Sequence, residues 1–325
     1  MTRAAAFFCV ADARYFLGAV GLVNSLRIQG HDEPIVLLDC GLTPAQRELL
    51  RHEVELEAAP RDAAPQVLKA IAPLRRPART SVLIDVDMIA TRSLAPLIER
   101  AAGGAALVFA DPQRRFFSEW GELLGLGATR PGPYVSSGLV ACGGEVGERI
   151  LHLLEEGGSK VDFARTFWGS NDRDYPFLYA DQDVLNAILA AAIPPGSYEV
   201  LDQRLSATPP FRALRMQDEG TLACRYPDGT SPYVVHQYVR KPWIEATYDG
   251  IYSRFLRRLL VGEGIAIRPP VEEIPLHLRA GPEARAARRR INATDYLRWR
   301  FGDRLPRPIA TRVEDLRRRR EAARR

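Results

Sequence analysis

Lysine is scarce in this sequence. The chain of 325 residues contains only Lys69, Lys160 and Lys241, and it uses arginine for most of its positive charge. The abundance of arginine is therefore as consistent with a compositional bias as with phosphate recognition. A lysine inside a motif is correspondingly more informative, because its compact ammonium group suits a phosphate oxygen as a point charge.

Cysteine pairs and long apolar runs are also missing. The four cysteines are scattered, and no two of them form a C-x-x-C pair. This excludes a disulfide framework and a zinc knuckle, and it favours a protein of the reducing cytoplasm. No run of 18 apolar residues exists, so no membrane-spanning helix is expected. The apolar start is short and reaches Asp12 early, so we interpret it as a strand and not as a signal peptide.

Negative charge is depleted at one end of the chain. Residues 285–325 contain 15 arginines and five acidic residues, a net charge of +10, whereas the whole chain carries +5. Residues 1–284 are therefore mildly acidic, at −5. Such asymmetry points to an anionic partner, a membrane surface or a nucleic acid, and the alternative is a solvated terminus. In residues 297–305, Trp299 and Phe301 alternate with arginines, which favours a peripheral anchor on the inner face of the membrane over nucleic-acid binding.

Apolar strands alternate with helical segments over the first part of the chain. Strands are expected at 4–11, 34–39, 54–58, 80–88 and 106–111, and helices at 15–29, from 43, near 63–72 and at 93–101. This alternation predicts a Rossmann-like, mostly parallel sheet flanked by helices. The later part is more mixed, with strands expected at 134–144, 198–202 and 231–239, and helices at 145–156, 181–191 and 244–260. The composition changes after residue 262, so we expect a catalytic domain over 1–262 and a Pro/Arg-rich extension over 263–325.

Acidic residues follow several of the predicted strands. In a parallel sheet, the carboxyl ends of the strands meet at one edge, and ligands bind there. The acids expected at this edge are Asp12, Asp39, Asp85, Asp87 and Asp111. The dinucleotide fingerprint G-x-G-x-x-G is absent, so a nicotinamide cofactor is not indicated.

Two of these acids form a D-x-D pair in the stretch SVLIDVDMIA. On a straight strand, Asp85 and Asp87 would point to the same face and repel each other. A divalent cation between them would remove this repulsion. The alternative is one helix-capping acid and one solvated acid, because a helix is expected to begin nearby.

A second strand, VVHQYVRKPW, ends with an imidazole and two cations. His236 would favour manganese over magnesium if it joined the two carboxylates, although a lone histidine after an apolar run is more often structural. Lys241 suits a diphosphate, and Arg240 is the alternative for that role. Arg79, just before the D-x-D strand, could reach a phosphate or the two acids, but a solvated arginine is slightly favoured.

Four segments together resemble the GT-A glycosyltransferases, most closely glycosyltransferase family 8. They are CVADARYFLGAVGLVNSLR, SVLIDVDMIA, the pair YVSSGLVACG and ADQDVLNAIL, and VVHQYVRKPW, and they span roughly residues 5–245. The resemblance implies a GT-A fold and transfer of a hexose from a nucleotide sugar, a UDP-sugar above all. It also implies retention of the anomeric configuration and a saccharide or lipid-linked acceptor.

The resemblance also implies roles for particular residues. Asp12 and Tyr15 would contact the base, and Asp85, Asp87 and His236 would bind Mn²⁺, or Mg²⁺ instead. The remaining residues are expected around the diphosphate, the transferred sugar or the acceptor; they are Lys241, Ser136, Ser137, Asp111, Asp181 and Gln182. For Asp183, a structural role is preferred.

The chain departs from the family pattern in two places. Four residues and no glycine separate His236 from Lys241, where the family usually has five residues with a glycine. Ser136 stands where the family usually has asparagine. Two rival functions also remain: a D-x-D phosphatase, and a nucleotide- or RNA-binding module that acts through the basic tail. The first is disfavoured because Ile89 stands where that motif needs Thr or Val, and the second leaves the ordered acids unexplained.

Overall fold

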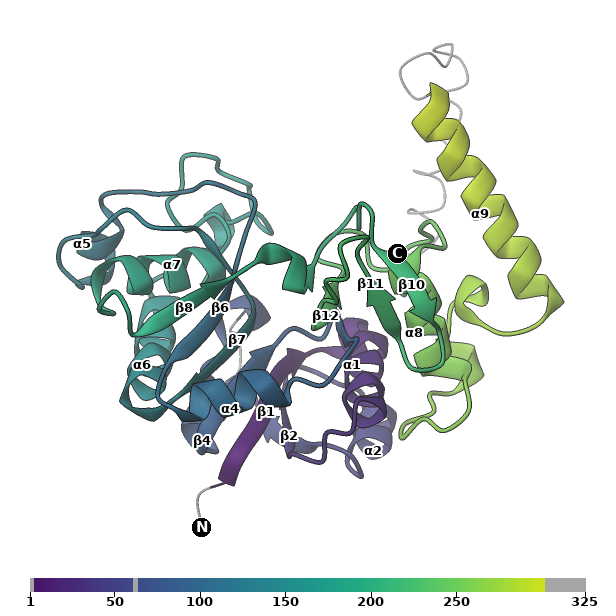
Figure 1. Ribbon diagram of the computed structural model, residues 1–325, viewed down its shortest axis with the longest axis horizontal. Coiled ribbons are helices and arrows are strands. Elements are labelled where there is room, and N and C mark those ends of the chain that lie inside the picture. Colours follow the sequence, from purple (N-terminus) through teal and green to yellow (C-terminus); the bar gives the residue numbers. More distant parts are fainter. Residues whose placement is uncertain (1–2, 61–63, 302–325) are drawn as a thin grey trace.

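A seven-stranded sheet forms the centre of the molecule (Figure 1). The computed structural model describes residues 3–60 and 64–301, with side chains described up to residue 295. The strands are ordered β3-β2-β1-β4-β7-β6-β8, and all neighbours are parallel except that β7 runs antiparallel to β4 and β6. Their bounds are β1 (Arg3–Ala11), β2 (Ile35–Asp39), β3 (Glu55–Ala58), β4 (Ala78–Ile84), β6 (Ala106–Ala110), β7 (Val135–Gly143) and β8 (Tyr198–Leu201). The predicted mostly parallel α/β sheet is confirmed.

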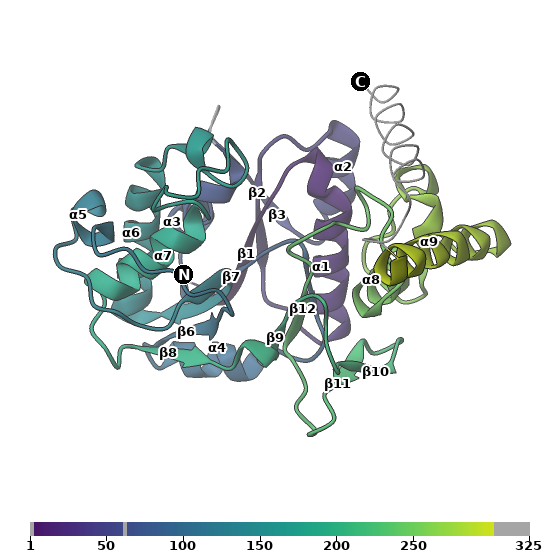
Figure 2. The same cartoon turned by 90° about the horizontal axis from the view of Figure 1, so that it is seen from above.

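Helices cover both faces of this sheet. Successive side chains of a strand point to opposite faces, so Phe7 packs into one hydrophobic core and Phe8 into the other. The first core is closed by α1 (Phe16–Ile28), α2 (Pro44–Leu50), α4 (Ala95–Ala102) and α8 (Ile251–Val261). The second is closed by α3 (Ile71–Arg75), α5 (Trp120–Leu124), α6 (Gly144–Ser159) and α7 (Asp181–Ala191). In Figure 2, α6 and α7 lie on one side of β6 and β7, and α4 lies on the other.

A small second sheet lies beside the carboxyl edge of the first. It has the order β5-β12-β9, with bounds β5 (Met88–Ala90), β9 (Ser206–Ala207) and β12 (Val234–His236). β12 is antiparallel to β5, and Met88 pairs with His236. This pairing brings a segment from late in the chain against the residues that follow β4. A hairpin of β10 (Arg215–Asp218) and β11 (Ala223–Arg225) projects nearby (Figure 1).

The chain after residue 262 is joined to the first core. Ile267, Ile274 and Leu278 are buried in the same cluster as α1 and α8. The Asn24 side chain donates to the carbonyls of Leu259 and Ile267 and accepts from the Ile267 N–H. The core therefore continues past the predicted boundary at residue 262.

Several predicted elements differ from the structure. The segment 85–87 is a turn between β4 and β5 and not part of a strand, and β12 is shorter than the predicted strand 231–239. The helix α5 lies between the predicted strands 106–111 and 134–144, where no element was predicted, and the Pro/Arg-rich extension contains the 20-residue helix α9 (Pro282–Phe301). The side chains of Trp299 and Phe301, on which the anchor prediction depends, lie outside the described residues. Among the described residues, no helix is long and apolar enough to cross a membrane.

Candidate active site

The D-x-D pair lies in a tight turn at the carboxyl end of β4. The Asp85 N–H donates to the carbonyl of Gly138 on β7, and the Met88 N–H donates to the carbonyl of Asp85. The expected geometry, two side chains on one face of a straight strand, is therefore wrong. The turn, which leads the chain from β4 of the central sheet into β5 of the second sheet, brings the two carboxylates together instead.

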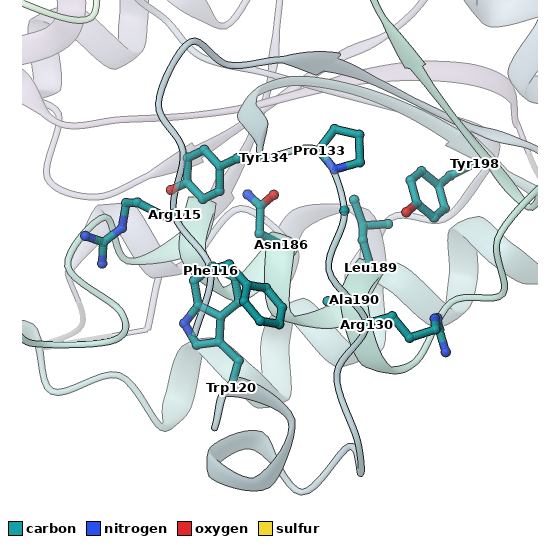
Figure 3. Close-up of a pocket in the computed structure, with 11 residues that line it drawn as sticks. Arg115, Phe116, Trp120, Arg130, Pro133, Tyr134, Asn186, Leu189, Ala190 and Tyr198 are labelled. Atoms are coloured by element: carbon teal, nitrogen blue, oxygen red, sulfur yellow. The ribbon is translucent and has the colours of Figure 1, made fainter. Parts of the chain in front are cut away.

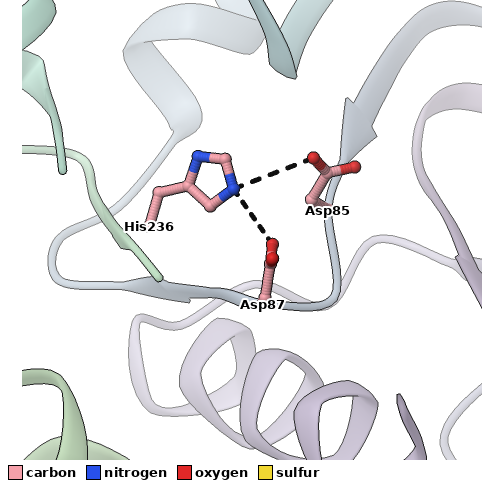
Figure 4. Close-up of side chains that lie close together, drawn as sticks. All are labelled: Asp85, Asp87 and His236. Atoms are coloured by element: carbon pink, nitrogen blue, oxygen red, sulfur yellow. Dashed lines mark ion pairs between the residues drawn. The ribbon is translucent and has the colours of Figure 1, made fainter. Parts of the chain in front are cut away.

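His236 completes a cluster with these two acids (Figure 4). Its Nε2 lies 3.1 Å from Asp87 Oδ1 and 3.9 Å from Asp85 Oδ2. One ligand atom from each of the three residues lies within 4.8 Å of the others. The buried Asp87 Oδ1 faces this imidazole. Two carboxylates and one imidazole fit a divalent cation such as Mn²⁺ or Mg²⁺.

Gly138 leaves the space in which this cluster forms. A Cβ atom at this position would lie 2.9 Å from His236 Cε1 and 3.2 Å from Asp85 Oδ2, and closer still to Met88 Cε. Any side chain would therefore displace the imidazole or the carboxylate. The sequence motif around 134–144 included this glycine, but only the packing across β7 shows why it has no side chain.

Two lysines neutralise the acids of the cluster. Lys241 Nζ forms a buried ion pair with Asp87 and donates to the carbonyl of Gln237 at 2.5 Å. Lys69 Nζ lies 2.6 Å from Asp85 Oδ1 and 2.7 Å from Asp181 Oδ2. Lys69 was missed by the sequence reasoning, although its rarity in this chain was a usable signal.

The neighbouring charges shift the pKa values of both acids. Burial opposes ionisation of Asp87, but the charges of Lys241 and His236 outweigh it and hold the pKa of this carboxyl well below its usual range. Burial raises the pKa of Asp85, and Lys69 offsets this only in part. Burial also disfavours the charged form of Lys69, but Asp181 and Asp85 raise its pKa above the ordinary lysine value.

The residues expected around the sugar and the acceptor gather on the β6–β7–α7 side of the cluster. Lys69 donates to the carbonyl of Ser137 at 3.1 Å, and the Ser137 N–H donates to Gln182 Oε1 at 3.4 Å. Asp111 follows β6, and its Oδ1 accepts from the Gln113 N–H at 2.8 Å. Burial raises the pKa of this carboxyl, and the hydrogen bond from Gln113, followed by the effect of Gln182, offsets the rise only in part. Ser136 is half-buried on β7, and its Oγ accepts from the Gly138 N–H at 3.2 Å.

A buried acid holds the turn that precedes α7. Asp183 Oδ2 accepts from the Tyr179 N–H at 2.7 Å, and its Oδ1 accepts from the Tyr134 hydroxyl at 2.7 Å. Ala180, between Tyr179 and Asp181, has a φ of 45°, a region that non-glycine residues rarely adopt. Such strain persists only where the surroundings impose it. Asp183 thus has the structural role preferred for it, and it orients Tyr179 and Asp181.

The two residues predicted to contact the base follow β1, the strand next to β4. Asp12 Oδ1 accepts from the Tyr15 N–H at 2.9 Å and so caps the short 3-10 helix η1 (Ala13–Tyr15). The Tyr15 ring meets Trp243 edge to face at 6.0 Å. Burial, with a smaller effect of Asp87, raises the pKa of Tyr15 to about 12. Asp12 and Tyr15 are therefore at the same edge as the cluster.

Two arginines that the sequence offered for phosphate binding, Arg79 and Arg240, lie away from the cluster. Arg79 is exposed near the start of β4, the end of the strand opposite to Asp85, and it lines a cavity with residues at the amino ends of β1 and β4. It cannot reach the acids, because six residue steps along an extended strand separate it from Asp85, about 20 Å at the usual rise per residue. Arg240 pairs with Glu245 at 3.0 Å, which leaves Lys241 as the cation at Asp87.

A small cavity lies beside α7 (Figure 3). Its lining includes Arg115, Tyr134 and Asn186. The Asn186 side chain is used by the fold, since its Oδ1 accepts from the Val135 N–H and its Nδ2 donates to the Val135 carbonyl. None of the three residues of the acid–histidine cluster lines this cavity.

Comparison with solved structures identifies the fold. No protein-family model matches the chain, and no curated protein matches it. The chain is similar to an active-site mutant of LgtC, with 15% identity and a TM-score of 0.54, over 82% of this chain and 98% of that one. It is similar to the galactosyltransferase LgtC in complex with donor and acceptor sugar analogues, with 15% identity and a TM-score of 0.53 over the same shares.

A third structure agrees with these two. The apo structure of the bifunctional glycosyltransferase WbbM matches with 14% identity and a TM-score of 0.51, over 82% of this chain and 50% of that one. Identities this low show the fold alone. The chain therefore has the fold of the GT-A glycosyltransferases, as the resemblance of its sequence motifs implied.

Proposed function

We propose that this protein is a metal-dependent glycosyltransferase. It would transfer a hexose from a UDP-sugar to a saccharide or lipid-linked acceptor, with the retention implied by the resemblance to family 8. The observation that carries the proposal is the convergence of Asp85, Asp87 and His236, with Lys241 beside them, at the carboxyl edge of a GT-A sheet.

Asp85, Asp87 and His236 would hold the cation, Mn²⁺ or alternatively Mg²⁺. When bound, such an ion neutralises the diphosphate and stabilises the charge that develops on it as it leaves. Lys241 is buried beside Asp87. Its ammonium group would therefore lie next to a diphosphate bound at the cation site and would stabilise the negative charge of its oxygens. Asp12 and Tyr15 would hold the base at the end of β1.

The residues of the β6–β7–α7 side would hold the transferred sugar and the acceptor. Asp181 and Gln182 stand at the first turn of α7, and Lys69 links Asp181 to the metal-binding turn through Asp85. Asp111, with its raised pKa and its place near Gln182, suits contact with a hydroxyl group of the acceptor or the sugar. Ser136 and Ser137 lie near the start of β7.

The test is binding of a panel of nucleotide sugars, with and without Mn²⁺, measured by calorimetry on the wild type and on Asp87→Ala. We expect one UDP-sugar to bind in a manganese-dependent way. We expect about 100-fold weaker binding or slower transfer in Asp87→Ala, because it removes both a ligand and the partner of Lys241. Absence of any nucleotide response in the wild type under either metal would contradict the proposed function.

A further inference from the structure

Two aromatic rings are exposed on the segment between α6 and α7. Phe167 is 50% exposed and Trp168 is 45% exposed. Their rings are 5.7 Å apart, edge to face, and Phe163 stacks against Trp168 at 6.3 Å with an interplanar angle of 12°. Adjacent large aromatic side chains left open to solvent are a common mark of a binding surface.

The segment presents these rings on an ordered backbone. The Phe167 N–H donates to the carbonyl of Leu178 at 2.8 Å, and the Asn171 N–H donates to the carbonyl of Thr166 at 2.9 Å. Arg165 pairs with Asp172 through two hydrogen bonds of 2.8 and 2.9 Å, which closes the loop. A surface held in this way loses little conformational entropy when it binds a ligand.

The rings continue into the proposed acceptor side of the site. Phe167 lies 6.1 Å from the ring of Tyr179, which stands two residues before Asp181. Tyr238, on the segment that follows β12, is 48% exposed, and its ring lies 5.8 Å from the His236 ring.

We propose that Phe167 and Trp168 form a stacking platform for the second sugar ring of an oligosaccharide acceptor. This inference rests on the proposed function and specifies the acceptor of the same site. The apolar face of a pyranose ring packs on an aromatic face, while its hydroxyl groups remain available to water and to polar side chains. An acceptor whose reacting hydroxyl lay near Asp111 and Asp181 would extend past Tyr179 toward this platform.

The surroundings favour a saccharide over a lipid surface. Side chains of both charges, including Arg165 and Asp172, flank the rings, whereas an anionic membrane selects a basic surface. The basic helix α9 lies at the other end of the molecule from α7 (Figures 1 and 2). The platform and the basic extension therefore do not form one continuous membrane-facing surface in the part of the chain that the structure describes.

The experiment compares Trp168→Ala and Trp168→Phe with the wild type. The probes are three sugar series of increasing length: glucose, maltose and maltotriose; glucose, cellobiose and cellotriose; and galactose and lactose. Transfer kinetics use the UDP-sugar that the calorimetric panel identifies. We expect Trp168→Ala to raise KM about tenfold for the di- or trisaccharide that accepts, with kcat and the monosaccharide KM within twofold of the wild type. Trp168→Phe keeps an aromatic face and should restore most of the affinity.

The matched control is Tyr248→Ala, which removes another exposed aromatic ring, 60% exposed, just before α8. It should leave all KM values unchanged. Donor binding by the wild type, with an unchanged oligosaccharide KM in Trp168→Ala, would overturn the platform and leave the proposed function intact. Failure of every probe as an acceptor in a donor-binding wild type would also overturn it. So would a loss of binding to anionic vesicles in Trp168→Ala without a change in KM. Failure of donor binding itself would instead contradict the proposed function.

Discussion

The strands on either side of β1 both end in acids, but the two ends are built differently. At the end of β2, Asp39 is satisfied by its own neighbourhood: its Oδ1 accepts from the N–H groups of Gly41 and Leu42, and its Oδ2 accepts from Arg47 at 2.5 Å. At the end of β4, the partners of Asp85 and Asp87 come from residues 69, 236 and 241.

The difference separates a structural acid from a candidate functional one. Asp39 closes a turn and orders the entry to α2, and its pKa is held low by these hydrogen bonds against the effect of burial. The β4 end gathers two carboxylates, an imidazole and two lysines from segments that are far apart in the chain. These partners lie outside the local turn, and they bring the two carboxylates and the imidazole close enough together to hold a metal ion.

The largest difference in stability between the two strand ends is expected when Lys69 is replaced. We expect Lys69→Ala to lower the free energy of unfolding by about 3 kcal/mol in the presence of EDTA, because it leaves the charges of Asp85 and Asp181 without their common partner. Addition of Mn²⁺ should recover part of this loss by replacing the missing positive charge at Asp85. Urea denaturation with EDTA and with Mn²⁺ measures both quantities.

Lys160→Ala is the matched control for this variant. Lys160 pairs with Glu156 on the surface of α6 and donates to the carbonyl of Leu124. Its loss should cost about 1 kcal/mol or less and should not depend on metal. Equal losses in the two lysine variants, or a loss in Lys69→Ala that Mn²⁺ leaves unchanged, would show that the β4 end is an ordinary charge network.

His277 contacts the segment that carries Lys241. Its Nε2 lies 3.0 Å from the carbonyl of Pro242, the residue after Lys241, and it faces Asp249, Arg257 and Arg288. Burial lowers the pKa of this imidazole below the ordinary value of 6.5, and the contact with Pro242 only partly offsets the effect. The unfolded chain therefore binds a proton more readily than the folded one.

It follows that the contribution of His277 to stability falls as the pH drops below about 6.5. We expect the wild type to lose about 1 kcal/mol more than His277→Gln when urea denaturation at pH 7.5 is compared with pH 5.5. His152→Gln, at an exposed position on α6, provides the control and should follow the wild type. An identical pH response in His277→Gln and the wild type would contradict the prediction.

The smallest effect is expected at the end of β2. Asp39→Asn keeps the size of the side chain but loses the charge on the hydrogen bond from Arg47, so stability should fall by less than about 1 kcal/mol. Because Asp39 belongs to the local turn, manganese-dependent binding of the nucleotide sugar should stay within twofold of the wild type. A loss of binding comparable to that in Asp87→Ala would remove the distinction between the two strand ends.

Much of the frame could be predicted because it depends on local patterns. The continuous apolar run of β2 and the Thr43–Pro44 start of α2 are signals that neighbouring residues carry, and α2 indeed begins with a capping box between Thr43 and Gln46. The acids at the strand ends could be predicted for the same reason. The packing of residues beyond 262 against α1 could not, because the contact of Asn24 with Ile267 joins residues that are more than 240 positions apart.

The site shows the same limit. Arg79 stands close to Asp85 in the sequence, but an extended strand separates them, whereas Lys69 is more distant along the chain and touches Asp85. Hydrophobic periodicity and residue spacing act over short distances, so they were enough to predict the sheet, the acids that follow its strands and the D-x-D motif. Which cations meet those acids, and where Phe167 and Trp168 lie, could be seen only in the folded chain, because these features depend on loops and strand pairings that bring remote segments together.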